Sequence, residues 1–565
     1  MRTLAKVAVV GLLCGAVACA PPLPDGNQQG RCQGKCEPAQ QGTTEAGLGP
    51  EWPADWTLLI FAANDDKDTR LVAAFDEDAE EIRQGLGGSA LFRIMMQRDY
   101  ADYQRDQRDV SRQSERFVVY REQQMHPARE RAGEAGALLL GETDTSDPQV
   151  LEDFLVAGIR RFPARRYWVI VTGHGDGWHG IAHDATTKRA MSLDGLSTAL
   201  RNASAVIANE IRATAGLDGA HLSRKIDVVQ FDACRLGQAE VMASLADSAD
   251  YMVASQEIVP NAGHPYSALR AVAQDHTRYE PKTIVREVVA DYVRSYVEGV
   301  STHDRAYVGQ TVSAFAVDLR KSQPLVDAIG DFSRALLRDR PAGLSCLEAA
   351  AVDRAAAERA GLYLPEPGEG AGRVIGAADF SSDMVALFEV FAGNQLVASR
   401  FPASCQPRAE FAPTEVSLGL SNETRRAALR VLDIIGRPHI ASKWAACGGS
   451  TLQYDGQYRQ LSSFEARGAQ LGDATIESPF VIEAHKVSSR GQRTLGMALF
   501  WGANPYDLTY RRDGKSALDA YLALPFERAS SWSRVMDQCI QQALACRNWD
   551  TSQSADPCAY ARQLP

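Results

Sequence analysis

Two residues of this sequence have the types and the surroundings needed for acyl transfer, a cysteine and a histidine. Cys234 follows the short apolar run IDVVQF and an aspartate, and His174 follows the apolar run YWVIVT within GHGDGW. A thiol attacks a carbonyl carbon as the thiolate, so a catalytic cysteine needs a base such as an imidazole nearby. Either residue alone is more often structural. The pair, placed after two such runs, predicts a nucleophile and its base.

The backbone next to this pair could stabilise the negative charge that develops on a carbonyl oxygen. The N–H groups of Gly175 and Cys234 are the candidate donors of such an oxyanion hole. We expect glycine at 173 and 175 because a substrate backbone must come close there. We also expect a helix to begin after Gly237, with a dipole that lowers the pKa of the Cys234 thiol.

Asp232 adds an argument about the substrate. Residues two apart in an extended chain share a side, so Asp232 and Cys234 should face the same cleft. A carboxylate beside the scissile bond favours a basic side chain in the specificity pocket. The alternative is that Asp232 caps the next helix or binds a loop amide. The two interpretations have about equal weight.

The elements that must position these residues are strands that alternate with helices. The apolar runs before Cys234 and His174 have the length and composition of buried parallel strands. Alternation of this kind predicts right-handed crossovers and a mostly parallel sheet covered on both faces, with its chemistry past the carboxyl ends of the strands. We expect strands at 56–62, 91–97, 117–120, 167–172, 226–232, 251–255 and 497–501. We expect helices at 71–82, 151–159, 193–213, 238–246, 283–300, 323–337, 379–391 and 423–435.

Composition excludes some classes of partner and leaves others open. The chain has 565 residues, of which 45% are hydrophobic and 23% charged, enough for two or more domains. Its net charge is −11 and no basic cluster stands out, which argues against a nucleic-acid partner. We therefore expect no nucleic-acid partner, whereas the acyl transfer predicted for Cys234 and His174 points to protein or peptide substrates.

The N-terminal residues predict export. Arg2 and Lys6 precede an apolar segment from Val7 to Ala18, which is too short to span a bilayer and typical of a signal peptide. The sequence Ala-Val-Ala before Cys19 resembles a bacterial lipobox, in which that cysteine is lipidated; ordinary signal cleavage nearby is the alternative. We therefore expect an exported bacterial lipoprotein, periplasmic or on the cell surface, with 1–19 as signal peptide and no membrane contact besides the anchor. Residues 20–55, rich in Pro, Gly and Gln, form the expected tether.

The cysteines outside the signal and the predicted site agree with export, because an even number of them remains. Disulfides are typical of such proteins, but eight cysteines leave the pairing open. Cys32 and Cys36 could also bind a metal, although no second pair stands near them. The eight are Cys32, Cys36, Cys346, Cys405, Cys447, Cys539, Cys546 and Cys558.

Several stretches together resemble the clostripain family of cysteine endopeptidases, whose relatives include the caspases, legumains and gingipains. YWVIVTGHGDGW resembles the family's histidine motif and FDACRLGQAEV its nucleophile motif. WTLLIFAANDD, GETDTSDPQVLEDFL, VASQEIVPNAGHPY, TVSAFAVDL, AADFSSDMVALFEVF and ERASSWSRVM resemble other segments, so the resemblance runs from about residue 56 to about residue 536. The two catalytic motifs together are specific, whereas either alone is weak.

The resemblance implies a caspase-like α/β/α sandwich with a mostly parallel sheet, a Cys–His dyad and cleavage after Arg or Lys. His174 and Cys234 match the dyad, and Asp232 matches an acid of the basic-selective pocket. A second pocket acid of the family is missing, because Ala262 stands at its position. The implied catalytic domain is 56–319, followed by a mixed α/β region at 320–565. Whether that region is a separate unit stays open.

Some members of the family cut themselves after the catalytic histidine, and DATTKRA lies at a comparable spacing here. We expect self-cleavage beside Lys188 or Arg189; a solvated basic loop is the alternative of equal weight. The mechanism requires no cofactor, although some members require calcium. Asn64, Asp65, Asp66 and Asp68 offer oxygen ligands without the spacing of a calcium loop, and helix capping is their favoured role.

Two other functions compete with the peptidase. A metal-dependent hydrolase could use His174, His179, His183, Asp176 and Asp184, but the glycines between them oppose the helix that a compact His-x-x-x-His site needs. We therefore expect no metal among the site residues. The second alternative is a catalytically silent surface lipoprotein that keeps the caspase-like fold as a binding scaffold. Both dyad residues are present, which favours the enzyme.

Overall fold

The computed structural model describes part of one compact unit, Glu51–Pro565. The described residues are 54–65, 69–86, 92–99, 114–118, 138–214, 216–269, 280–298, 312–360, 363–364, 373–374, 381–393, 416–435, 480–487, 497–501, 511–512 and 515–547. The predicted signal peptide, Cys19 and the predicted tether up to residue 53 lie outside them. No helix of this described part has the length and apolarity needed to cross a membrane.

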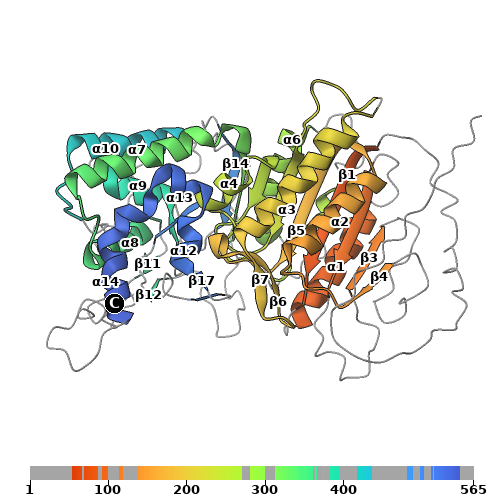
Figure 1. The fold of residues 1–565 in the computed structure, drawn as a ribbon, viewed down its shortest axis with the longest axis horizontal. Coiled ribbons are helices and arrows are strands. Elements are labelled where there is room, and N and C mark those ends of the chain that lie inside the picture. The colour runs from red at the N-terminus through yellow and green to blue at the C-terminus, as the bar shows by residue number, and fades with distance from the viewer. Residues whose placement is uncertain are drawn as a thin grey trace, which may run out of the picture. The chain divides into compact units, whose positions relative to one another are not determined.

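A nine-stranded sheet forms the centre of the described residues (Figure 1). Its strands in spatial order are β14 (Val481–Val487), β10 (Val312–Asp318), β9 (Ala249–Ala254), β8 (Ile226–Asp232), β5 (Ala164–Gly173), β1 (Ala54–Ala63), β2 (Phe92–Arg98), β3 (Ser114–Val118) and β4 (Leu138–Gly141). Strands β9, β8, β5, β1 and β2 are joined by parallel pairing, and the remaining strands pair antiparallel at both edges. The predicted mostly parallel sheet is confirmed.

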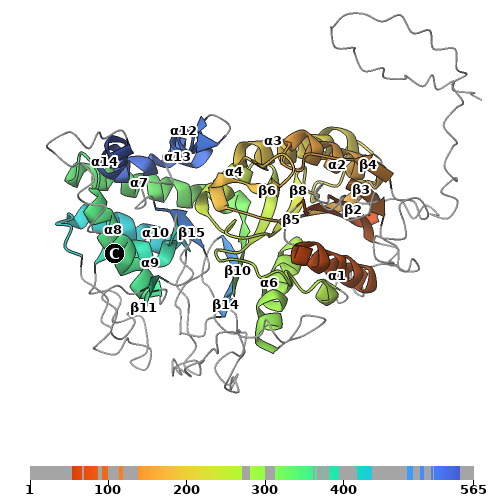
Figure 2. The same ribbon diagram turned by 90° about the horizontal axis from the view of Figure 1, so that it is seen from below.

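Helices cover both faces of this sheet, because its central strands are apolar on both sides. In β8, Val229 and Phe231 belong to one buried cluster, whereas Val228 belongs to the other. Figure 2 shows one face covered by α2, α3 and α4 and the other by α1 and α6. These helices are α1 (Thr69–Leu86), α2 (Pro148–Arg161), α3 (Leu193–Val206), α4 (Ala239–Leu245) and α6 (Pro281–Glu298). The architecture is an α/β/α sandwich.

Most predicted helices and strands are present, with shifted ends. The helix expected at 193–213 is divided, because α3 ends at Val206 and a π-helical turn, Ile207–Ile211, follows. The helix expected at 379–391 begins later, since β13 (Ser381–Asp383) precedes α9 (Met384–Ala392), and Asp383 caps the helix through the Ala386 N–H. Helix α8 (Cys346–Ala360) was not predicted, and its alternation of apolar and polar residues is weak.

The region after residue 319 is mainly helical and packs onto the first part of the chain. Its helices, besides α8 and α9, are α7 (Gln323–Asp339), α10 (Asn422–Ile435), α12 (Ala517–Leu522), α13 (Pro525–Ser530) and α14 (Asp537–Arg547). Its short strands are β11 (Tyr363–Leu364), β12 (Arg373–Val374), β13, β15 (Ala498–Phe500), β16 (Arg511–Arg512) and β17 (Lys515–Ser516). Strand β14 extends the central sheet, and one buried cluster contains residues from both regions. The boundary at 319 stays a prediction, and the sheet and core continue across it.

A disulfide joins two helices of this second region. Cys346, at the start of α8, is bonded to Cys539 of α14, with 4.3 Å between the two Cα atoms. The pair closes a loop of 193 residues, which restricts the unfolded chain. Sequence alone left this pairing open. Among the described residues whose side chains are placed, Cys234 is the free cysteine.

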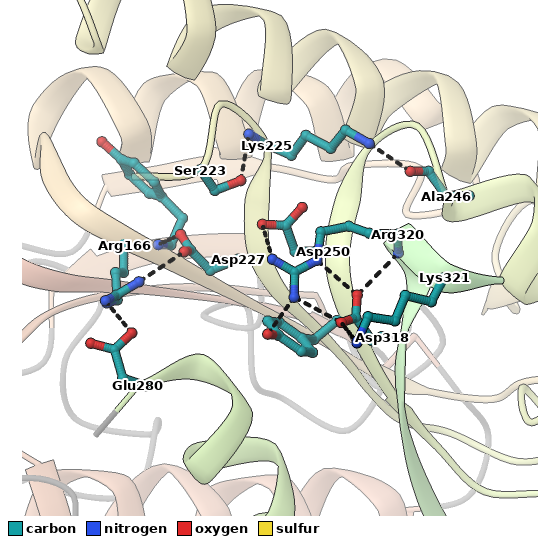
Figure 3. Close-up of polar contacts among 12 residues, drawn as sticks. Arg166, Ser223, Lys225, Asp227, Ala246, Asp250, Glu280, Asp318, Arg320 and Lys321 are labelled. Carbon is teal, nitrogen blue, oxygen red and sulfur yellow. Dashed lines mark hydrogen bonds and ion pairs between the residues drawn. The ribbon is translucent and has the colours of Figure 1, made fainter. Parts of the chain in front are cut away.

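The amino ends of the central strands carry a network of paired charges (Figure 3). Asp227 is buried at the start of β8, where its Oδ2 accepts the N–H of Tyr167 at 2.8 Å. Its other oxygen lies 3.5 Å from the guanidinium of Arg166, which also bonds Glu280. Burial raises the pKa of Asp227 to about 7. This carboxylate thus joins the first residues of β5 and β8.

A second group of paired charges lies one strand further along the same edge. Arg320 donates to both oxygens of Asp318, at 2.7 and 2.8 Å, and also to the hydroxyl of Tyr251. Its guanidinium lies 3.9 Å from the carboxylate of Asp250. Each acid of this edge faces a cation.

Candidate active site

The strands that precede His174 and Cys234 are direct neighbours in the sheet. Strands β5 and β8 pair in parallel, and Thr172 of β5 lies opposite Asp232 of β8. His174 and Cys234 each come two residues after this pair, so the two loops begin at the same level. The condition on which the predicted dyad depends, adjacency of the two strands, is met.

Both residues line one pocket past the carboxyl ends of these strands. Its volume is about 290 Å³. Four segments supply its walls: a face of α1, the two strand-end loops, and the loop after β9. The lining residues are Leu71, Ala74, Phe75, Asp78, Thr172, Gly173, His174, Gly175, Asp232, Ala233, Cys234, Arg235, Ile258, Val259, Pro260, Asn261 and Gly263. Asp232 and Cys234 therefore share a cleft, as their spacing predicts.

Cys234 is half-buried against the loop after β9. The Val259 N–H donates to its Sγ at 3.4 Å, and the thiol lies 3.8 Å from the Val259 carbonyl oxygen. Burial raises the thiol pKa above its usual value, more than the Val259 N–H and the Arg235 charge lower it. The predicted lowering of the thiol pKa is not found, because burial outweighs the interactions that favour the thiolate.

His174 extends from the end of β5 with an exposed imidazole. Its carbonyl oxygen accepts the Ala182 N–H at 3.0 Å, which ties the loop to strand β6 (Ile181–Asp184). The rings of His174 and His183 meet edge-on with centroids 6.3 Å apart. The ring is thus exposed at the pocket on a backbone that is held by β6.

The glycines beside His174 are needed for packing within the protein. A Cβ atom on Gly175 would lie 2.5 Å from the Cys234 carbonyl oxygen, so the two catalytic loops touch there. Gly173 has a φ of +130°, and a Cβ there would lie 2.6 Å from the Ala63 carbonyl oxygen. Close approach of a substrate stays a prediction, and both glycines line the pocket. They let the histidine loop lie directly against the cysteine loop and β1.

The N–H groups predicted for the oxyanion hole have no partner in the described part of the chain. Around Gly175 the antiparallel bridge to Ile181 uses the groups of the flanking residues, through Ala182 N to His174 O and Asp176 N to Gly180 O. No hydrogen bond from the Gly175 or Cys234 N–H to a described residue is present. Both donors remain available to an oxygen in the pocket.

Asp232 lies at the base of the pocket and is nearly fully buried. Its Oδ2 accepts the N–H of His264 at 3.1 Å and the hydroxyl of Tyr266 at 2.7 Å. The loop reaches it because Gly263 has a φ of +57°, and a Cβ there would lie 2.7 Å from Oδ2. Asp232 thus holds a loop amide, the alternative interpretation, while it also faces the pocket.

The region after residue 319 supports both catalytic loops, a role that sequence reasoning missed. Glu240 of α4 accepts the N–H of Phe500 and the hydroxyl of Tyr521, each at 3.0 Å. Burial raises the pKa of Glu240 to about 7. Trp178, in the histidine loop, packs edge-on against the rings of Phe500 and Tyr521. No local pattern marks such contacts between distant segments.

A second hydrogen-bonded tie joins these loops to each other. The N–H of Trp178 donates to the Gln238 side chain at 2.8 Å, and the Ala498 N–H donates to the Gly237 carbonyl at 2.7 Å. An ion pair at 3.4 Å between Arg235 and Asp176 lies at the surface above them. The loops are therefore fixed mainly by residues that do not line the pocket, Trp178, Gln238 and Ala498.

Lys188 ends the turn between β6 and β7 (Arg189–Met191), and Arg189 begins β7. Both are exposed, and Arg189 pairs with Asp144 at 2.7 Å. Lys188 has a φ of +59°, in the left-handed region that favours glycine. Neither residue lines the pocket. The turn is open to solvent and held by polar contacts.

Three buried acids cluster beneath this turn. Among the described residues, Asp65, Asp99 and Asp184 form the group whose ligand atoms lie within 4.8 Å of one another. Asp65 Oδ2 accepts the N–H of Thr186 at 2.9 Å, and its Oδ1 has no hydrogen-bond partner. Asp65 therefore binds the turn and does not cap α1 as expected, while Asp66 and Asp68 lie outside the described residues.

The histidines of the alternative metal site do not form a common ligand set among the described residues. His179 stacks on Trp178 with centroids 3.8 Å apart, and Asp184 faces the other acids. The group in the described residues that could hold a metal contains no imidazole. This geometry opposes a zinc hydrolase built on these residues.

A mostly parallel α/β sandwich with a cysteine and a histidine past adjacent strand ends defines a cysteine hydrolase. The family model described as the clostripain family matches residues 67–356, more than half of the chain. The chain belongs to the clostripain family, and it is a cysteine-type endopeptidase with a caspase-like fold. Hydrolysis by a thiol and an imidazole needs no cofactor. No curated protein matches the chain.

Solved structures that resemble the chain are proteases of the same family. A secreted C11 cysteine protease from Bacteroides thetaiotaomicron, in complex with an irreversible peptide inhibitor, is 14% identical, with a TM-score of 0.43 over 85% of this chain and 99% of that one. An inactive zymogen C11 protease from Parabacteroides distasonis is 12% identical, with a TM-score of 0.42 over 85% of this chain and 98% of that one.

Proposed function

We propose that this peptidase uses Cys234 and His174 to hydrolyse peptide bonds after Arg or Lys. The observation that carries the proposal is one pocket lined by the thiol, the imidazole and the buried carboxylate of Asp232. Burial in the pocket strengthens the attraction between that carboxylate and a cation. A basic P1 side chain fits this charge, and its scissile carbonyl would then lie at Cys234.

The chemistry proceeds in two displacements. The Cys234 thiol gives its proton to His174 as Sγ bonds to the carbonyl carbon, and the N–H groups of Gly175 and Cys234 bind the oxyanion. His174 then passes the proton to the leaving nitrogen, the C–N bond breaks and a thioester remains. Water loses a proton to His174 as it attacks the thioester. The new acid leaves and the thiol is restored.

Labelling with a peptidyl acyloxymethyl ketone tests the proposal. The Arg or Lys form should label Cys234, and a leucine form should label it far more slowly. Cys234→Ala should remain unlabelled and His174→Ala should react slowly, while both keep the melting temperature of the wild type. A folded wild type that reacts with none of these probes and cuts no peptide would support the alternative, a silent binding scaffold.

Self-cleavage beside Lys188 or Arg189 is a second part of the proposal. The solvent-exposed basic residues of the β6–β7 turn match the P1 preference proposed for the pocket. Intact mass should show two fragments for the wild type and one chain for Cys234→Ala. Lys188→Gln with Arg189→Gln should also stay intact although its thiol is functional. Cleavage that persists in Cys234→Ala would assign the cut to another protease.

Export with a lipid anchor at Cys19 is proposed from the N-terminal sequence. The disulfide between Cys346 and Cys539 supports it, because such bonds persist in oxidising compartments. A fatty-acid label should enter the wild type and not Cys19→Ala. A soluble, unlabelled wild type in the cell envelope would favour ordinary signal cleavage.

We place calcium, as an accessory ion, at Asp65, Asp99 and Asp184. Three buried carboxylates fit a hard cation, and Oδ1 of Asp65 accepts no hydrogen bond from the described residues. Burial also raises the pKa of Asp65 to about 6, so a shared proton is the competing occupant. Calcium should raise the melting temperature of the wild type and not that of Asp65→Asn. Equal shifts in both proteins would rule out this site.

A further inference from the structure

One wall of the pocket is a face of α1, and one of the four α1 residues that line it is an acid. Leu71, Ala74, Phe75 and Asp78 line the pocket, and their spacing of three and four residues places them on one side of a helix. The first three are apolar. Asp78 is therefore the exception on a face that otherwise excludes water.

Asp78 is buried without a compensating charge. The residue is only 6% exposed, and it has no ion pair or hydrogen bond to another described residue. A buried carboxylate normally has donors or a cation, because its desolvation is costly. An unpaired acid in a cleft is a sign of function.

The alternation along the strands places Asp232 on the α1 side of the sheet. Val228 belongs to the buried cluster that contains α1 residues, and Asp232 follows four positions later on the same side. Helix α1 also packs against the turn Tyr266–Leu269, whose first residue bonds Asp232. Asp78 and Asp232 thus face one pocket from different walls.

We propose that Asp78 is a second specificity-determining carboxylate of the P1 pocket, which binds the basic side chain together with Asp232. This inference rests on the proposed preference for Arg and Lys. The acid expected beside Asp232 is absent, because Ala262 stands in the loop between the lining residues Asn261 and Gly263. Helix α1 supplies the missing charge from the opposite direction.

The two acids differ in how they are held. Asp232 receives two hydrogen bonds on one oxygen, from the His264 N–H and the Tyr266 hydroxyl. Asp78 receives none from the described residues, and burial, followed by the charges of Asp232, Glu81 and Glu77, raises its pKa well above the usual range. A P1 cation in the pocket would favour the ionised form of Asp78.

Kinetics with matched peptides test the role of Asp78. The peptides carry Arg, Lys or citrulline at P1, citrulline being the neutral isostere of Arg. Asp78→Asn should lower kcat/KM for Arg and Lys by about tenfold to a hundredfold, mainly through KM, and leave citrulline unchanged. Asp76→Asn is the matched control on the same helix: Asp76 pairs with Arg98 at 2.6 Å outside the pocket, and its loss should change no ratio.

The outcomes separate this inference from the proposed function. If the wild type prefers Arg to citrulline, Asp232→Asn loses the preference and Asp78→Asn keeps it, the role of Asp78 is overturned and the basic preference stands. If the wild type shows no preference for Arg, both proposals fall. Far-UV circular dichroism establishes that each variant is folded before its ratio is compared.

A pH profile gives a second readout that a merely structural role would not produce. Below its raised pKa Asp78 is neutral, so the ratio of kcat/KM for Arg over citrulline should rise with pH as Asp78 ionises. The rise should be missing in Asp78→Asn and present in Asp76→Asn. A profile that is the same in wild type and Asp78→Asn would overturn the inference.

Discussion

At the amino ends of β5, β8 and β9 the acids face cations, whereas at the carboxyl ends of β5 and β8 they face a pocket. Asp227 and Asp318 are buried at the first edge and lie against Arg166 and Arg320 (Figure 3). Asp232 is just as buried at the second edge and is held by an amide and a phenol, with no cation among the described residues.

The comparison shows at which edge of the sheet polar groups lack a charged partner within the protein. The same strands supply both edges, so the composition of a strand alone does not decide whether its acids are paired with cations. Paired charges at one edge join strand to strand, and unpaired polar groups at the other are available to a substrate. We therefore expect substitutions at the amino edge to change stability and substitutions at the pocket to change activity.

The largest expected effect is at the dyad. Cys234→Ala or His174→Ala should each lower kcat/KM by about a thousandfold or more, because nucleophile and base act as one unit. The melting temperature should stay within a few degrees, since neither side chain is fully buried. Activity assays with thermal unfolding check this. A dyad variant that unfolds would blur the comparison between the two edges.

Asp227→Ala should lower stability and leave activity unchanged, which is the opposite of the result expected for the dyad variants. It leaves the Tyr167 N–H without its acceptor and removes one of the two acids that Arg166 contacts, at a cost of about 3 kcal/mol in the free energy of unfolding. Turnover per folded molecule should be unchanged. Urea unfolding measures the free energy of unfolding, and titration of active sites gives the turnover per folded molecule. Asp227→Asn is the control, because its amide oxygen still accepts the Tyr167 N–H.

The pH dependence of the same residue sharpens the test. The pKa of Asp227 is raised from 3.8 to about 7, so the folded protein holds a proton that the unfolded chain releases. The stability linked to this proton is complete below about pH 4 and is lost as pH rises through about 7. Unfolding from pH 4.5 to 8 should show this loss in the wild type, and Asp227→Asn should lack this component. Equal profiles would contradict the assignment.

Glu240 tests what decides whether a substitution changes stability or activity. The two possibilities are the distance of the residue from the pocket and the presence of hydrogen-bond partners within the protein. Glu240 lies near the pocket but has donors, so Glu240→Ala should behave like the amino edge and cost about 2 kcal/mol of stability. Any loss of kcat should be smaller than for the dyad, because the side chain supports the loops without lining the pocket. Glu240→Gln retains an acceptor and should recover most of the stability. A thousandfold loss of kcat in a folded Glu240→Gln would place it in the chemistry.

Arg320→Gln should have the smallest effect, about 1 kcal/mol or less. Its side chain is 45% exposed, and solvent screens its ion pair with Asp318. The loss should shrink further in 0.5 M salt, roughly three times the physiological concentration. A salt-independent loss of several kcal/mol would show that the pair is effectively buried. Urea unfolding at two salt concentrations gives the comparison.

The sequence by itself determined the alternation of strands and helices and the side that Asp232 faces, and the structure places the predicted dyad residues, His174 and Cys234, past adjacent strand ends. These features depend on local spacing: a period of two along β8 decides which side chains share a face. Two other features depend on distant segments, which no spacing within one segment reveals. They are the packing of Gly173 and Gly175 against Ala63 and the cysteine loop, and the burial that raises the thiol pKa.

Tertiary structure decided which distant segments meet. It joined Tyr521 to Glu240 across 281 residues and Cys346 to Cys539 across 193. It also placed Asp78 opposite Asp232, although Asp78 belongs to a helix that periodicity alone describes as apolar on that face. The physical reason is that a residue pattern specifies which face of an element is buried, whereas its partner is selected by packing among all elements at once.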